Sequence, residues 1–375
     1  MTLADKVSIA RRFQRAVRID SDLGRADALH GFVCQRSACD ALLNLAHQIA
    51  ATKQRAFTWT GPYGGGKSSL AVALAGLLGA KNEVRAAAIS ALGAQMATRL
   101  FDVVQPSRAG WLVVPVVGRR GDPIADIGAS LEDARRAASS KRGRPRSDVR
   151  NGRELIARLV EEATARPKDG VLLLIDELGK YLESAAADGK DIHFFQELAE
   201  AASRAPGRLV VIGILHQAFE QYAHRLGREA RDEWAKIQGR FSDVPLIAPV
   251  DEVIDLLGRA INANIAHPDT ACTAELVAQS MLSRRPGTAS NLGARLDASW
   301  PLHPVTAAVL GPMSRRRFGQ NERSVFGFLT SAEPGGFQEF LRAAPSASSA
   351  SFGPDQFWDY LRINLEPDRR SRTAV

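Results

Sequence analysis

The chain has few cysteines and no long apolar run. Cysteine occurs at only three of the 375 positions, Cys34, Cys39 and Cys272. Their spacing matches no metal-binding motif and an odd number gives no even disulfide framework, so we expect a reducing compartment. No apolar run approaches the roughly 20 residues that a membrane-spanning helix needs, and the first residues, MTLADKVSIARRF, lack the apolar core of a signal peptide. These absences predict a soluble, cytoplasmic protein that does not cross a membrane.

The composition is otherwise that of a globular protein. Hydrophobic residues make up 45% of the chain and charged residues 24%, and 375 residues are enough for two or three domains with cores of their own. The net charge is +8, from 49 basic and 41 acidic residues. Such an excess favours a polyanionic partner, although nucleotide-binding proteins can be basic for other reasons.

The most informative segment is a glycine-rich run, GPYGGGKSS. Its spacing satisfies the phosphate-loop pattern G-x-x-x-x-G-K-[ST]. In such a loop the backbone N–H groups face the phosphates, Lys67 would reach the β- and γ-phosphates, and the Ser68 hydroxyl would bind Mg²⁺. The sequence therefore predicts a site for ATP and Mg²⁺. The predicted nucleotide-binding residues of the loop are Gly61, Pro62, Tyr63, Gly64, Gly65, Gly66, Lys67, Ser68 and Ser69.

The residues on either side of this run favour the same interpretation. RAFTWT, residues 55–60, predicts a strand that enters the turn. SSLAVALAGLLGA, residues 68–80, predicts a helix that is buried on most sides. Phosphates would then lie at a helix N-terminus, where free amides and the helix dipole favour an anion. A chance glycine-rich turn is the less favoured alternative.

Two acidic residues end a second apolar run, GVLLLIDELGK at 170–180. Open parallel sheets bind ligands at the carboxyl ends of their strands, so we expect Asp176 to hold Mg²⁺ and Glu177 to act as the general base on the attacking water. The alternative is that the two acids merely lead the strand into solvent. NTPases with a glutamate beside this aspartate generally hydrolyse ATP and have an additional strand between the two motifs. The apolar run at 111–118 fits that strand.

A further buried strand, RLVVIGIL at 208–215, leads into His216 and Gln217. A polar side chain in this place can contact the γ-phosphate or the attacking water, which would make Gln217 catalytic and His216 a nucleotide contact. Alternatively, the pair caps the helix that follows.

Strand and helix patterns alternate as far as residue 250, and the strands are apolar on both faces. This alternation indicates a parallel sheet covered by helices on both sides. After residue 250 only helical patterns remain. We expect an N-terminal helical segment at 1–54 and a three-layer αβα P-loop NTPase core at 55–250 with a basic insert at about 139–152. An all-helical region that includes the C-terminal helices follows at 251–375.

Several segments together resemble one group of bacterial ATPases. The segments are GPYGGGKSSL, LLLIDELGKYLE, GILHQAFEQYA, EWAKIQGRFSDVPL and PLHPVTAAVLGPMSRRRFGQNERSVFGFL. They resemble the AAA+-like ATPases related to those of BREX-type phage-defence systems and other bacterial conflict systems, over residues 25–365. The resemblance implies an ATP-binding αβα core, a helical lid and a role in anti-phage or mobile-element defence. Members of the group are usually far longer, with added domains after the lid.

The resemblance also implies assembly into a homo-oligomer or a defence complex. In AAA+ ATPases an arginine of one subunit usually completes the site of its neighbour. Arg240 is the first candidate because it precedes a strand-like segment, and Arg323 or Arg317 would be the lid arginine that contacts the nucleotide. An ordinary surface arginine is the alternative at each of these positions.

A basic loop at 141–147, KRGRPRS, contains the R-G-R-P core of an AT-hook. Arg142, Arg144 and Arg146 would lie in the minor groove of A/T-rich double-stranded DNA. The alternative is a solvated basic insert that binds no DNA.

Two functions fit these patterns. The first is an ATPase that couples nucleotide turnover to assembly on, or remodelling of, nucleic acid. The second is a signal-transducing NTPase switch, which oligomerises with ATP and acts through a separate effector protein. Stimulation of turnover by DNA distinguishes them.

Overall fold

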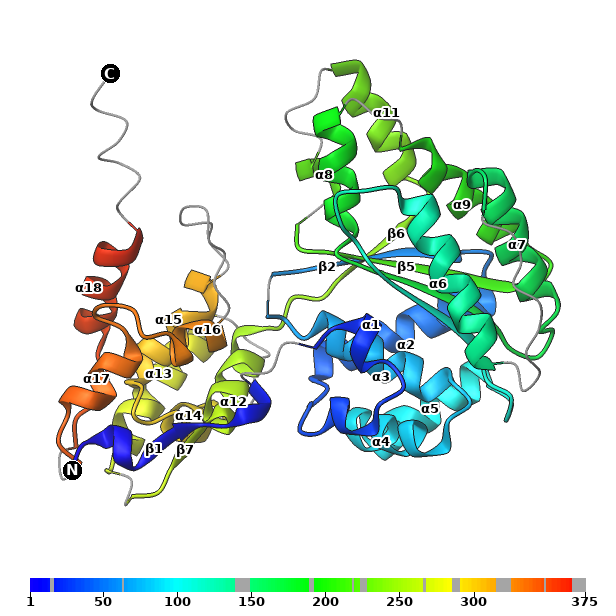
Figure 1. Cartoon of the computed structure of the whole chain (residues 1–375). Coiled ribbons are helices and arrows are strands. Elements are labelled where there is room, and N and C mark those ends of the chain that lie inside the picture. Colours follow the sequence, from blue (N-terminus) through cyan, green and yellow to red (C-terminus); the bar gives the residue numbers. More distant parts are fainter. Residues whose placement is uncertain are drawn as a thin grey trace. The chain divides into compact units, whose positions relative to one another are not determined.

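The computed structural model describes residues 1–13, 17–62, 64–138, 149–188, 192–217, 219–222, 228–265, 268–284, 291–314, 325–346 and 349–365. These residues form two compact units. We call residues 17–61 and 66–247 the core unit, and residues 1–16, 62–65 and 248–375 the second unit. Figure 1 colours both along the chain.

The core unit is built on a five-stranded sheet in which every pairing is parallel. The strands lie in the order β3-β4-β5-β2-β6. Their bounds are β2 Ala56–Thr60, β3 Leu112–Val117, β4 Gly170–Asp176, β5 Arg208–Leu215 and β6 Ser242–Pro245. The α/β class and the parallel sheet expected from the sequence are confirmed. The run at 111–118 does form a strand, but β3 is at the edge of the sheet, and the strand that separates β2 from β4 is β5.

Both faces of the sheet are covered, because alternate residues of each strand enter different hydrophobic cores. In β4, Leu172 and Leu174 belong to one core, whereas Leu173 and Ile175 belong to the other. All seven residues of β4 are buried. This two-sided burial explains why the strands read as continuous apolar runs rather than as alternating patterns.

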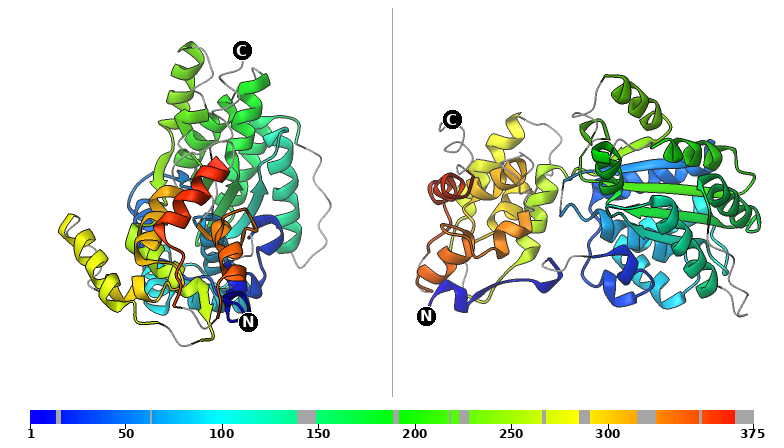
Figure 2. Two further views of the ribbon diagram at one scale, coloured as in Figure 1. Left: turned by 90° about the vertical axis from the view of Figure 1, so that its left-hand side faces the viewer. Right: turned by 45° about the horizontal axis from the view of Figure 1, so that its top comes forward.

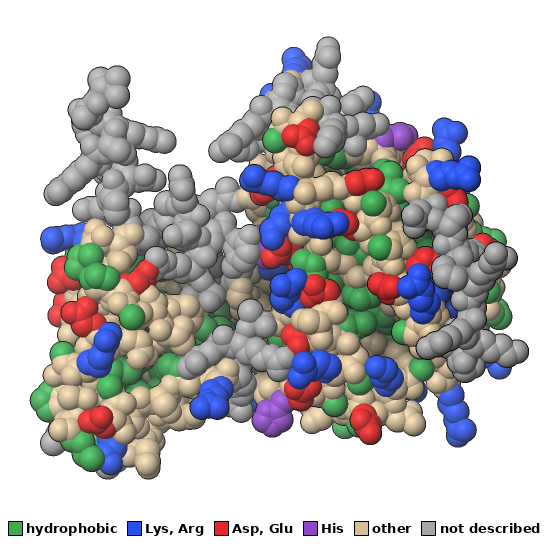
Figure 3. All heavy atoms as spheres, viewed as in Figure 1, with side chains coloured by type: hydrophobic (Ala, Val, Ile, Leu, Met, Phe, Trp, Pro, Cys, Tyr) green, Lys and Arg blue, Asp and Glu red, His purple; other side chains and the backbone are tan. Residues whose placement is uncertain are grey.

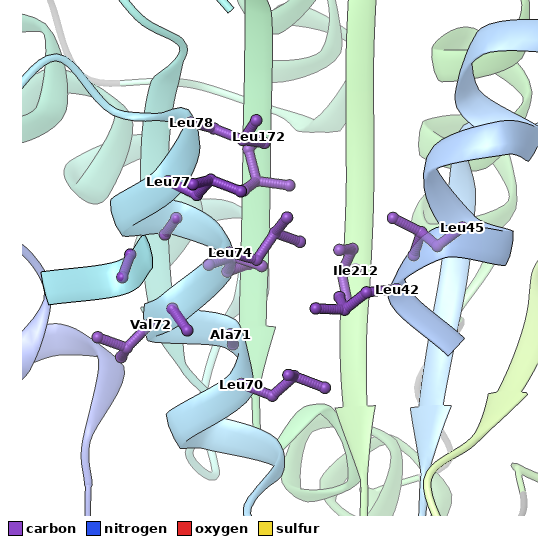
Figure 4. Packing of buried hydrophobic residues seen from close by; sticks show 14 of the residues in the cluster. Leu42, Leu45, Leu70, Ala71, Val72, Leu74, Leu77, Leu78, Leu172 and Ile212 are labelled. Carbon is purple, nitrogen blue, oxygen red and sulfur yellow. The ribbon is translucent and has the colours of Figure 1, made fainter. Parts of the chain in front are cut away.

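Helices from the first part of the unit cover one face. They are α1 Ile19–Asp22, the 3₁₀ helix η3 Ala26–Leu29, α2 Arg36–Ala51, α3 Lys67–Leu78, α4 Asn82–Leu92 and α5 Ala94–Val104. Figure 4 shows Leu70, Leu74 and Leu77 of α3 pointing toward the strands, and Leu42 and Leu45 of α2 approaching the same layer. Because α3 lies between the sheet and other helices, ten of its twelve residues are buried, as expected from its apolar sequence.

Later helices cover the other face, as Figures 1 and 2 show. They are α6 Pro123–Ala138, α7 Gly152–Thr164, α8 Leu178–Asp188, α9 His193–Arg204, α10 Phe219–Tyr222 and α11 Arg228–Gln238. The core unit therefore has three layers, with helices on both sides of the sheet.

The second unit is mainly helical and has its own hydrophobic core. Its helices are η1 Leu3–Asp5, η2 Arg11–Phe13, α12 Val250–Ala260, α13 Ala271–Arg284, α14 Leu292–Asp297, α15 Pro304–Ser314, α16 Val325–Thr330, α17 Phe337–Ala343 and α18 Pro354–Leu365.

Two short strands in the second unit correct the sequence analysis. β1 (Val7–Ile9) pairs antiparallel with β7 (Ile261–Ala263). The unit is therefore not all-helical, and residues 1–54 are not one helical segment, because residues 1–16 group with the second unit. Strands of three residues are too short to show a periodic pattern. No helix within the described ranges combines the length and apolar character needed to cross a membrane.

Candidate functional site

The glycine-rich loop joins β2 to α3 at the carboxyl edge of the sheet. Gly61 follows β2 directly, and a Cβ atom placed on it would lie 2.4 Å from the carbonyl oxygen of Leu246. Gly64 and Gly66 have φ angles of 70° and 76°, in the left-handed region that favours glycine. A side chain would clash at Gly61 and would be strained at Gly64 and Gly66, which explains why glycine occupies these positions. Tyr63 lies outside the described residues.

Lys67 and Ser68 begin α3, immediately after Gly66. The Lys67 side chain is only 4% exposed, and its Nζ donates a hydrogen bond of 2.7 Å to the Gly61 carbonyl. A buried ammonium group is costly unless it has partners, so this geometry keeps a positive charge inside the curve of the loop. Ser69 lies in the same first turn and is half-buried.

The loop meets the acidic end of β4 through one hydrogen bond. The Ser68 hydroxyl donates to Oδ2 of Asp176 over 2.8 Å, although the two residues are 108 positions apart in the sequence. The Asp176 side chain is buried, at 6% exposure, and its Oδ1 accepts a bond from the Glu177 N–H. Burial raises the pKa of Asp176, and the two hydrogen bonds oppose this effect. The two predicted Mg²⁺ ligands thus lie side by side.

Glu177 follows Asp176 in an unusual backbone conformation. Its φ is 52°, in the left-handed region that non-glycine residues seldom adopt. Such a conformation costs on the order of 1–3 kcal/mol and persists where the surroundings enforce it. Gly118, at the end of β3, is one such neighbour: its N–H donates to the Asp176 carbonyl over 2.7 Å, and an added Cβ would meet Glu177 O at 2.2 Å.

Lys180, which the sequence analysis did not select, also belongs to this site. Its Nζ, in the first turn of α8, forms an ion pair with Oε2 of Glu177, which directly precedes the helix. The opposite charges of Glu177 and Lys180 in ELGK, three residues apart where a helix begins, are a signal that could have found it.

His216 and Gln217 follow β5 at the same edge of the sheet and are half-buried. The pKa of His216 is lowered to about 3, first by burial and then by the positive charges of Lys67 and Lys180. The imidazole is therefore neutral at pH 7. Because both lysines lower this pKa, His216 lies within electrostatic reach of Lys67 and of Lys180.

A second contact fixes α8 to the end of β3. Asp126 on α6 accepts hydrogen bonds from Arg119, over 3.0 Å, and from the Tyr181 hydroxyl, over 2.7 Å. The Arg119 guanidinium holds the pKa of Asp126 below its usual range, while burial and the bond to Asp126 raise the pKa of Tyr181. Since Arg119 follows Gly118 and Tyr181 follows Lys180, this cluster braces the backbone on both sides of Glu177.

Arg240 lies at the amino ends of the strands, opposite the carboxyl ends where the glycine loop lies. It precedes β6, whose Ser242 is paired with Phe57 near the start of β2, and its carbonyl accepts a bond from Gln54. Its side chain is 53% exposed and contacts Glu200 at 3.2 Å. Arg240 is therefore separated from Lys67 of its own chain by the length of the strands.

Five other predicted residues lie outside the described part of the chain. They are the two candidate lid arginines and the three arginines of the basic loop: Arg323, Arg317, Arg142, Arg144 and Arg146. On the face shown in Figure 3, acidic and basic side chains of the described residues are interspersed over the core unit.

The site contains oxygen groups of the kind that Mg²⁺ prefers. Among the described residues, no three His, Cys, Asp or Glu side chains gather into a metal-binding group. Mg²⁺ in nucleotide sites is usually held by one or two protein oxygens, water and the phosphates themselves, rather than by a protein cage. The Ser68 hydroxyl and the Asp176 carboxylate match this requirement. Compared with known proteins, the chain matches no family model, and no curated protein sequence matches it significantly.

Proposed function

We propose that this chain binds and hydrolyses ATP with Mg²⁺. The observation that carries the proposal is the 2.8 Å hydrogen bond between Ser68 and Asp176. It joins a glycine loop and helix N-terminus to a buried carboxylate at the carboxyl edge of a parallel sheet, where such sheets bind ligands. A structural role alone gives no reason for a buried lysine, a buried aspartate and a strained glutamate to converge there.

Each residue then has a chemical role. The loop amides and Lys67 would bind the phosphates. Ser68 and Asp176 would hold Mg²⁺, which would supply positive charge beside the phosphate oxygens. Glu177 accepts the proton of the attacking water. Lys180 orients the Glu177 carboxylate through their ion pair. Neutral His216 and Gln217 supply hydrogen-bonding groups near the terminal phosphate without adding charge.

The strand order supports the class of NTPase expected from the sequence. In that class an additional strand lies between the strands that carry the two motifs, and β5 lies between β2 and β4. The second unit would be the lid, and defence against phage or mobile elements remains the proposed biological setting. We propose that turnover is coupled to nucleic acid.

Steady-state ATP hydrolysis, with and without double-stranded DNA, tests this proposal. The matched control is Glu177→Gln, which removes the base but keeps the size of the side chain. We expect the control to bind ATP and to lose about 10²-fold or more in turnover. DNA stimulation would support coupling to nucleic acid, whereas turnover indifferent to DNA would favour the switch. Wild-type protein that neither binds nor hydrolyses ATP would refute the proposal.

If Arg240 acts on ATP, it must act on a neighbouring subunit, because it lies at the far edge from its own Lys67. Mixing Arg240→Ala with Lys67→Ala tests this. Each variant alone should be inactive, while mixed oligomers regain activity at sites that pair an intact Lys67 with an intact Arg240. Full activity of Arg240→Ala alone would exclude the role.

A further inference from the structure

Two of the three cysteines lie in contact, although their spacing in the sequence suggested no pairing. The Cys39 thiol donates to the Cys34 sulfur, and the two sulfur atoms are 3.0 Å apart. Neither residue is in a disulfide and both are half-buried, so small reagents can reach their thiols. Cys272 lies apart from them in sequence and in the second unit, and is exposed.

We propose that Cys34 and Cys39 are a redox modification site, which closes to an intramolecular disulfide with a peroxide-class oxidant. A disulfide needs sulfur atoms about 2 Å apart, so rotation of the side chains brings these sulfurs from 3.0 Å to bonding distance. A pair of contacting thiols of this kind fits a reversible role, because disulfides in reducing compartments are usually transient or redox-sensing.

The local backbone presents the two thiols to each other. Cys39 lies in the first turn of α2, and its N–H donates to the Gln35 carbonyl. The positive end of a helix favours an anion such as a thiolate. Cys34 lies in the preceding extended segment and is fixed by a bond from its N–H to the Ala91 carbonyl on α4. The pair therefore sits where a loop enters a helix, and not on one helix face.

The oxidation has a balanced course. One thiolate attacks a peroxide oxygen, the O–O bond breaks, and the sulfur becomes a sulfenic acid as the first water leaves. The second thiol then attacks the sulfenic sulfur, the S–S bond forms, and the hydroxyl leaves as a second water. Two thiols lose two electrons and two protons in total, and one hydrogen peroxide is reduced to two waters.

Cys34 lies two residues after Phe32, which is a neighbour of the glycine loop. A Cβ placed on Gly66 would be 3.5 Å from the Phe32 ring. A covalent link at Cys34 would therefore tether the segment that packs beside the start of α3. Formation of the disulfide does not depend on the proposed ATPase function, and its test needs no nucleotide.

Mass spectrometry of the whole chain after treatment with hydrogen peroxide tests the proposal. Trypsin cleaves after Arg36, between the two cysteines, so a Cys34–Cys39 disulfide links the peptides 26–36 and 37–53. We expect this linked pair, reversed by dithiothreitol, and a fall in reactive thiols from three to one.

Serine variants provide the controls. Cys272→Ser should form the same linked peptides, whereas Cys34→Ser and Cys39→Ser should form none and instead yield a dimedone adduct of the sulfenic acid on the remaining cysteine. Three thiols that persist after peroxide, or linked peptides that contain Cys272, would overturn the proposal.

Discussion

Gly118 offers a sharp test of how the candidate site is held together. In Gly118→Ala the new Cβ would lie 2.2 Å from the Glu177 carbonyl oxygen, 2.8 Å from its carbon and 3.1 Å from the Asp176 oxygen. An ordinary carbon–oxygen contact is roughly 3.3 Å, so the closest pair must separate by about 1 Å. Both neighbours are backbone atoms and cannot rotate away. The strand end or the turn at Glu177 must therefore move.

The expected loss has two parts. Overpacking of this kind lowers the free energy of unfolding by about 1–3 kcal/mol. A displacement of about 1 Å at a catalytic group can lower turnover about 10²-fold. Since Lys67 and Ser68 do not contact Gly118 in the described hydrogen bonds, ATP affinity should fall much less than turnover.

Gly121→Ala is the matched control, because it lies in the same connection between β3 and α6. A Cβ on Gly121 would meet only the Arg119 side chain, at 3.8 Å. We expect its free energy of unfolding to stay within about 0.5 kcal/mol of wild type and its turnover to be unchanged. Urea unfolding and steady-state ATP hydrolysis of both variants are the measurements. If Gly118→Ala behaves like Gly121→Ala in both, the packing argument is refuted.

Three further predictions concern charge at the site. Asp176→Asn should raise the free energy of unfolding at pH 7, because burial raises the pKa of Asp176 and disfavours its ionised form. This gain in stability should shrink as the pH falls toward 3.8 and Asp176 becomes protonated. Urea unfolding at several pH values measures it, and a gain that stays constant would contradict the reasoning. His216 has a pKa of about 3 in the folded chain, below its ordinary 6.5. Between pH 7 and pH 5 it therefore takes up a proton mainly in the unfolded chain, and wild type should lose stability relative to His216→Gln. A difference in unfolding free energy between the two proteins that stays the same over this range would contradict the prediction. Lys180→Met should change the free energy of unfolding by less than about 1 kcal/mol, since the ion pair of Lys180 with Glu177 is partly exposed. The same variant should raise the pKa of His216 in an NMR titration, because a nearby positive charge is removed, and should lower kcat more than ATP affinity. An unchanged pKa of His216 would show that Lys180 does not belong to the site.

Local patterns in the sequence predicted most elements of the core unit. The run at 170–176 is apolar without interruption because β4 is buried on both faces, and it ends at the residue where the acids begin. The helix predicted over residues 68–80 is present as α3, Lys67–Leu78, so its bounds differ by one residue at the start and two at the end. These features depend on near neighbours in the chain, which is why the sequence alone suffices for them.

Features that depend on distant residues could not be predicted. Periodicity indicates which face of a strand is buried but not which strand lies beside it, so the position of β5 between β2 and β4 was not expected. The same holds for the pairing of β1 with β7, which joins residues 7–9 to residues 261–263. The contact between Cys34 and Cys39 depends on how the segment before α2 bends, and no residue pattern records that bend.

The energetics of the strand end favour a functional interpretation over a structural one. An acid that only leads a strand into solvent would be exposed, and a turn in the left-handed region would usually be made by glycine or asparagine. Here Asp176 is buried with a raised pKa, and the left-handed position is occupied by Glu177. Both features lower the stability of the fold, and Asp176 lies within electrostatic reach of the buried Lys67. Sites that retain such strain and desolvation together are usually sites that use them. This convergence at one edge of the sheet supports the proposal that Asp176 and Glu177 act at the terminal phosphate of ATP.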